Sequence, residues 1–148
     1  MASTQAMCTS FKQELLTGIH VIGTDTLKVA LYLDAATLGA GTTEYSTTSE
    51  VGNSGSYVAG GSTVTFQAPA ATGTTVYTGP ASASTVSWTT FSATGFSAAL
   101  IYNSSKVNGT TRGRSISVHT FASQTITAGT FTITFPTNDA TTGLLRFV

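Results

Sequence analysis

Charged residues are scarce in this chain, which has six Lys and Arg and six Asp and Glu among 148 residues and a formal net charge of zero. Proteins that bind nucleic acid rely on Lys and Arg at phosphates, so we expect no nucleic-acid partner. Disordered chains are highly charged and poor in apolar residues, whereas 41% of this chain is hydrophobic. The chain should therefore fold. A surface with so little charge protects poorly against self-association, which favours a protein that works inside an assembly.

Cysteine and long apolar runs are scarce too. The single cysteine, Cys8, cannot form a disulfide within the chain. No apolar run reaches the roughly 18 residues of a membrane-spanning helix, so we expect no membrane partner. Residues 1–7 lack the basic and apolar regions of a secretory signal, which predicts synthesis in a cytosol.

Threonine and serine are abundant, with 31 and 17 copies. Threonine is β-branched and suits the solvent face of a pleated sheet. Short alternating segments recur at roughly ten-residue spacing, which is typical of a sandwich or barrel. We predict an all-β protein, an antiparallel β-sandwich whose closure as a jelly roll stays open, in one domain over residues 24–148. The predicted strands cover residues 27–33, 63–68, 74–77, 85–91, 98–103, 115–121, 130–135 and 144–148.

Alternation within these strands predicts which side chains are buried. Trp88 is expected in the core, with Phe91 on the opposite face of the same strand. Phe131 and Ile133 are expected to face inward while their threonine neighbours face solvent. The dipeptide at 108–109, Asn-Gly, predicts the turn of a hairpin, in a connection longer than two residues.

One short helix is predicted near the N-terminus, in an arm that spans residues 1–23. Ser10 is the expected N-cap, supported by Gln13 three residues later, and Gly18 is expected just past the end. A helix of about nine residues must dock to be stable, on its own sheet or on a neighbouring subunit. We expect deletion of residues 1–18 to leave a folded β-domain that no longer stays on particles.

Residues 34–62 form a long polar excursion rich in glycine, with short β segments expected around Tyr45 and Tyr57. Long loops in compact domains are usually functional or ordered by a partner, so this is the leading predicted contact region. Arg112 and Arg114, with Lys106, form the one basic cluster, which suits either a partner's acidic groups or a solvated hairpin tip. The predicted interface residues are Phe11, Leu15, Leu16, Tyr45, Tyr57, Arg112 and Arg114.

Catalytic and metal-binding patterns are weak. His20 and His119 are far apart with no acidic residue close in sequence, so both are expected at the surface or a subunit contact. Glu44 and Glu50 share the polar excursion, but nothing near them positions a sugar. No G-x-S-x-G motif is present. We therefore expect no enzymatic activity, no metal and no cofactor.

Several segments, in order over nearly the whole chain, resemble a family of small structural proteins from tailed bacteriophage virions. They are residues 10–20, 24–32, 36–40, 50–51 with 57–61, 99–106 and 131–140. The resemblance implies a capsid decoration (cement) protein or a tail-associated protein, with no catalytic residues. Decoration proteins sit on the outer capsid surface, commonly as homotrimers, and clamp neighbouring copies of the major capsid protein. The alternative is a tail or fibre component that contacts a host receptor.

Overall fold

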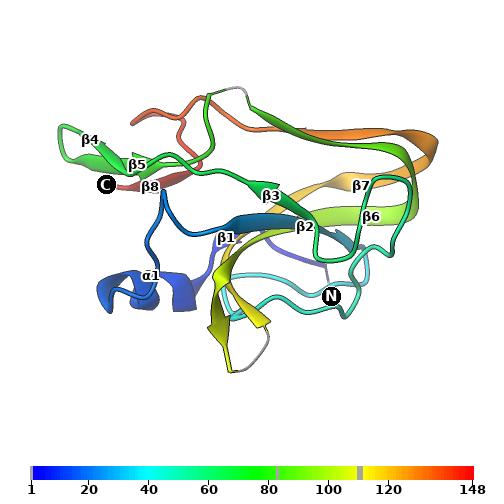
Figure 1. Cartoon of the computed structure of the whole chain (residues 1–148), viewed down its shortest axis with the longest axis horizontal. Coiled ribbons are helices and arrows are strands. Elements are labelled where there is room, and N and C mark those ends of the chain that lie inside the picture. Colours follow the sequence, from blue (N-terminus) through cyan, green and yellow to red (C-terminus); the bar gives the residue numbers. More distant parts are fainter. Residues whose placement is uncertain (1, 83, 110–111) are drawn as a thin grey trace.

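The computed structural model describes residues 2–82, 84–109 and 112–148, and its regular structure is antiparallel β-sheet with one short helix. Five strands form one sheet in the order β1-β7-β6-β2-β3, and three form a small sheet in the order β4-β5-β8 (Figure 1). This confirms the predicted all-β, sandwich-like fold. The elements are β1 (Ala6–Met7), α1 (Thr9–Leu16), β2 (Leu27–Leu33), β3 (Ser62–Val64), β4 (Ala70–Thr72), β5 (Thr75–Thr78), β6 (Thr85–Asn108), β7 (Arg112–Thr134) and β8 (Leu145–Phe147).

Strands β6 and β7 form one long hairpin of the five-stranded sheet. This hairpin folds over, so that its two halves lie in two different layers of the molecule. The sequence predicted four short strands here, but each neighbouring pair is one continuous strand of more than twenty residues. The first part of β6 and the last part of β7 run in one layer and curve round into the other at one end of the molecule (Figure 1). The register shifts repeatedly between Trp88 and Ala98, and such β-bulges bend and twist a strand.

The bulges also correct the predicted faces of β6. Thr90 has a positive φ of 52°, and the register shifts between Trp88 and Phe91. Both aromatic rings consequently lie on the inner side, where each contacts Phe131. Trp88 is buried as predicted, and its indole nitrogen donates to Ser62 Oγ at 2.8 Å. The prediction that Phe91 faces away from Trp88 was therefore wrong.

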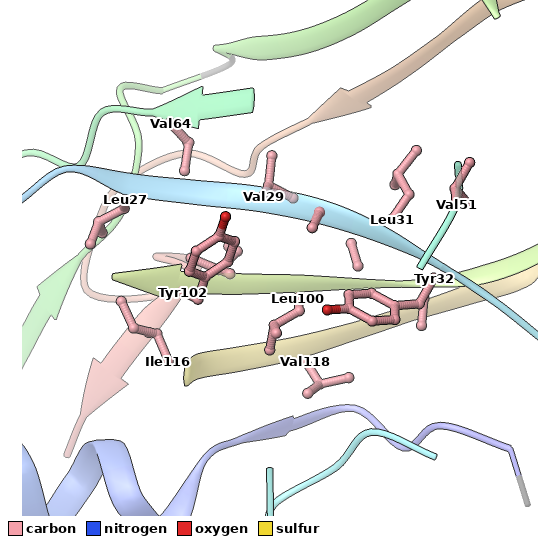
Figure 2. Close-up of a cluster of buried hydrophobic side chains, with 14 of the residues drawn as sticks. Leu27, Val29, Leu31, Tyr32, Val51, Val64, Leu100, Tyr102, Ile116 and Val118 are labelled. Carbon is pink, nitrogen blue, oxygen red and sulfur yellow. The ribbon is translucent and has the colours of Figure 1, made fainter. Parts of the chain in front are cut away.

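The five-stranded sheet is covered on both faces. Ala30 of β2 pairs with Leu100 of β6, which pairs with Val118 of β7, so the three side chains form one row on one face. Figure 2 shows Leu100 and Val118 below β2, toward the N-terminal segment, and Val29 on the other side. Residues on both faces of β2 are buried, so the simple alternation predicted for this strand holds only in part.

The N-terminal segment is part of the fold rather than a separate arm. Met7 of β1 pairs with Ser117 of β7, and the Cys8 amide donates to the Ile116 carbonyl at 2.9 Å. Phe11 of α1 has no exposed surface. Deleting residues 1–18 would remove this packing from one face of the sheet, so we now expect the deletion to destabilise the rest of the chain.

The helix has different boundaries from those predicted. Its N-cap is Cys8 rather than Ser10, and no side chain caps it. Gly18 does follow the helix, with a φ of 73° that glycine adopts readily. Because the Gly18 and Ile19 amides donate to carbonyls of the last turn, the chain turns sharply back toward the sheet.

Candidate binding surfaces

An apolar groove lies between α1 and the small sheet. Its volume is about 510 Å³, and Lys12 is the one charged residue among the side chains that line it. Leu16 is 91% exposed, and Val76 and Phe147 are more than one third exposed. The groove is lined by Phe11, Lys12, Leu15, Leu16, Ile22, Pro69, Val76, Tyr77, Thr78 and Phe147.

The helix creates this groove because only one side of it packs on the sheet. Phe11 fills the space above β7, and Leu15 is half-buried, while Leu16 projects into solvent at the last helical position. The opposite wall comes from β5 and β8, which pair through Val76 and Phe147. Two neighbouring structural units thus expose apolar side chains toward one open space.

A buried polar network lies behind α1. His20 Nε2 is 2.7 Å from Glu14 Oε2, and His20 Nδ1 is 3.0 Å from the Asn103 amide nitrogen. The His20 side chain has no exposed surface. The prediction of a surface histidine without an acidic neighbour was therefore wrong, because the turn after α1 brings Glu14 back to His20.

The orientation of the Asn103 amide determines which His20 ring nitrogen donates a hydrogen bond and which one accepts. Its Oδ1 accepts from the amides of Ser105 and Lys106, so its amide nitrogen must face His20 and Asp25. His20 Nδ1 is then an acceptor, and Nε2–H donates to Glu14. Every partner is within the chain, so this network holds α1 and the following loop on the sheet.

The basic cluster of the hairpin pairs with acidic residues of the same chain. Arg112 Nη1 lies 3.0 Å from Glu44 Oε1, and Arg114 Nη1 lies 2.5 Å from Glu14 Oε1. Lys106 Nζ is 3.7 Å from Asp25 Oδ1. The sequence analysis gave two interpretations of this cluster, contact with the acidic groups of a partner or a solvated hairpin tip. Neither interpretation included ion pairs within the chain. The turn beyond Gly109 lies in part outside the described residues.

Glu50 anchors the polar excursion of residues 34–62. Its carboxylate accepts hydrogen bonds from Tyr45 Oη at 2.5 Å, Tyr57 Oη at 2.9 Å and the Gly60 amide at 2.6 Å. Burial, together with this carboxylate, raises the pKa of the Tyr57 phenol. The Tyr57 hydroxyl also accepts from the Leu31 amide, which joins the excursion to β2.

This arrangement explains how a long segment without extended strands is ordered by its own chain. Its β contacts near Tyr45 and Tyr57 are isolated bridges, Glu44 with Arg114 and Ser54 with Tyr57. Glu50 is occupied by the tyrosine hydroxyls and Glu44 by Arg112. Both carboxylates thus have structural partners.

The predicted interface residues fall into four groups. Phe11 and Tyr57 have no exposed surface, so they are core residues and cannot contact a partner in this conformation. Tyr45 is half-buried and stacks on Tyr102. Leu15 and Leu16 line the apolar groove, while Arg112 and Arg114 form ion pairs on the hairpin. The groove wall formed by β5 and β8 was not predicted, since those strands are short and distant in sequence.

His119 lies in a second apolar opening, between the two layers. This cleft of about 210 Å³ is lined by parts of β2, β6 and β7 and by the segment around Phe135. Burial lowers the pKa of His119 to about 4, and its Nε2 is 2.9 Å from Ser117 Oγ. The residue is half-buried rather than fully exposed, and the expectation of a subunit contact stays a prediction.

Within the described residues, no three His, Cys, Asp or Glu side chains gather as a metal site. No helix in the described part of the chain is long and apolar enough to cross a membrane. No protein-family model matches the chain, and no match was found among curated proteins or solved structures.

Proposed function

We propose that this chain is a structural virion protein of a tailed phage, a decoration protein that binds the outer surface of the head. Its partner is the major capsid protein, and it clamps neighbouring capsid subunits. It is made in the host cytoplasm and acts on the capsid surface as homotrimers, without nucleic-acid or membrane partners. The proposal starts from the sequence resemblance to small virion proteins.

The observation that supports this function best is the apolar groove between α1 and the small sheet. Contiguous exposed apolar surface on a soluble protein commonly marks a protein–protein contact. Here Leu16 is almost fully exposed beside Val76 and Phe147. A capsid segment that buried these side chains would gain affinity by the hydrophobic effect.

A weak individual contact is sufficient for this role. Copies joined in one oligomer bind the shell together, and the high effective concentration multiplies their separate affinities. The near absence of charge suits such binding, since few ionic groups would lose hydration on docking. The Glu14–His20 contact behind α1 and the pairing of β5 with β8 hold the two walls of the groove in place.

The test compares two exposed apolar positions on particles stripped of this protein. Leu16→Glu places a charge in the groove, and Val58→Glu places one on the polar excursion, where Val58 is 62% exposed. We expect Leu16→Glu to reduce co-sedimentation with particles at least tenfold and Val58→Glu to bind as the unchanged protein does. Full binding by Leu16→Glu would overturn the role of the groove.

Copy number separates the proposed role from the alternative, a tail or fibre component. A decoration protein is present in many copies distributed over the head, because it follows the capsid's repeated lattice. A tail component would be found in few copies at one vertex. Quantitative gels of purified virions measure this directly, and a few copies per particle would contradict the capsid role.

A further inference from the structure

The last part of β7, residues 125–134, has a neighbouring strand on one side only. It pairs with β6, from Thr134 opposite Thr85 to Thr125 opposite Thr94. Strand β1 pairs with β7 only at Ser117 and Val118. The isolated bridge of Glu44 with Arg114 also lies on this outer edge, and within the described residues nothing pairs with the outer edge of residues 125–134. An unpaired strand edge presents main-chain donors and acceptors to another chain.

The hydrogen-bonding pattern shows which residues offer those groups. The Phe135 amide donates to the Ser84 carbonyl at 2.9 Å, so residue 135 bonds toward the β6 side. Since bonding direction alternates along an antiparallel strand, Phe131 and Ile133 also bond toward β6. The N–H and C=O groups of Thr130, Thr132 and Thr134 therefore point outward, and their side chains are exposed.

This edge lacks the usual protection against pairing. Natural edge strands carry charges, proline or a bulge that turn another strand away. Residues 115–138 contain no Asp, Glu, Lys or Arg, and proline first appears at Pro136. The bulge near Ala128, which has a φ of 47°, lies before residues 131–134, which pair with β6 without a register shift. That stretch remains open for main-chain pairing.

The inner side of the same edge is apolar. Phe131 and Ile133 are half-buried, and Ile133 borders the cleft of about 210 Å³ that opens between the layers. A strand added at this edge would cover these side chains as well as bond the main chain. A charged strand would lose hydration here without finding a counter-charge, so the edge fits an uncharged one.

We propose that the occupant is a second copy of this chain, paired antiparallel along residues 130–134 about a twofold axis centred on Thr132. The two copies then present the same uncharged edge to each other, and a twofold contact of this kind forms a closed dimer. Threonines face threonines on the outer side, and Phe131 and Ile133 of each copy extend one apolar row. The proposed homotrimer would form on the capsid through a different surface, so the twofold pairing is the one expected between copies in solution.

Light scattering on the purified full chain tests the pairing through the mass of the assembly. Thr132→Pro removes the outward N–H without removing a bond to β6, whereas Thr132→Val keeps the N–H. Both variants lose the hydroxyl contact to Ser87, so they form a matched pair. We expect Thr132→Pro to halve the mass and Thr132→Val to leave it unchanged. Equal masses for the two variants, or an unmodified chain with an odd number of copies, would overturn the proposal.

A crosslink keeps the test decisive if Thr132→Pro fails to fold. The one native cysteine, Cys8, is buried, so an introduced cysteine reports its own contact. Facing residues of paired strands have Cβ atoms about 5 Å apart, so Thr132→Cys should form a covalent dimer on mild oxidation. Thr85→Cys, on the same exposed face but on β6 rather than on the outer edge of β7, should stay monomeric on a denaturing gel. Equal crosslinking of both variants would overturn the pairing.

Discussion

His20 and Glu14 are six residues apart in sequence and lie on either side of the end of α1, with 2.7 Å between Nε2 and Oε2. The other oxygen of Glu14 accepts from Arg114 on β7. One carboxylate thus connects the helix, the loop that follows it and the main sheet. Because Glu14 is buried, each of its hydrogen bonds compensates for lost hydration.

The two hairpin arginines should differ in their effect on stability. Arg114→Ala leaves the buried Glu14 carboxylate short of a partner, and we expect a loss of about 1–3 kcal/mol in the free energy of unfolding. Arg112 pairs with Glu44 in an exposed position, so Arg112→Ala should cost no more than about 1 kcal/mol. Urea denaturation of both variants measures the difference. A larger loss for Arg112→Ala would contradict the assignment of Glu14 as the buried junction.

Substitutions at two apolar residues of α1 should also differ clearly in their effect on stability. Phe11 is fully buried, so Phe11→Ala should cost about 3–5 kcal/mol through lost burial and the cavity left behind. Leu16 projects into solvent, and Leu16→Ala should change stability by no more than about 0.5 kcal/mol. Thermal or denaturant unfolding checks both values. If Phe11→Ala were as stable as Leu16→Ala, the N-terminal segment would not be an integral layer of the fold.

Gly61 and Gly73 provide a matched test of how closely the polar excursion packs on the backbone of β2. Both glycines have positive φ angles, 72° and 59°. A Cβ at Gly73 would meet open space, so Gly73→Ala should cost about 1 kcal/mol from its left-handed conformation alone. A Cβ at Gly61 would overlap the Val29 carbonyl oxygen of β2. Gly61→Ala should therefore lose about 3 kcal/mol, by adding this overlap to the same backbone strain. Equal losses in denaturant unfolding would mean that the excursion does not pack so closely on β2.

The half-buried position of His119 predicts a stability that depends on pH. Its pKa falls from 6.5 to about 4 in the folded chain, so between these values the unfolded chain alone binds the proton. The free energy of unfolding is therefore unaffected by this group above pH 6.5. It decreases as the pH falls from 6.5 toward 4, by at most about 3 kcal/mol. Unfolding of His119→Gln and the unmodified chain at pH 7 and pH 4.5 isolates the effect. An identical acid loss in both would show that His119 is not the source.

The two proposed contacts use different elements, so their variants give separate readouts. Leu16→Glu should release the protein from particles without changing its mass in solution. Thr132→Pro should change that mass while leaving the groove intact. If only one of these results is obtained, the other proposal fails alone.

Much of the β structure could be predicted because it is encoded locally. Alternating apolar and polar residues identify β2 and the two ends of the long hairpin, and Trp88 was correctly placed in the core. The bend could not be predicted, because a local pattern does not distinguish a bulge within one strand from a break between two. The apolar groove and the network of Glu14, His20 and Asn103 were missed for a related reason. Their members come from elements that only tertiary packing brings together.

By itself, the sequence determined that this is an all-β protein with a threonine-rich surface and almost no charge, since composition and alternation act residue by residue. The tertiary structure decided which of its apolar residues are core and which remain exposed. All three of Phe11, Tyr57 and Leu16 had been predicted as contact residues. The fold buried Phe11 and Tyr57, and it left Leu16 exposed to solvent. The physical reason is that burial depends on what the rest of the chain places above a side chain, and that is a property of the whole fold.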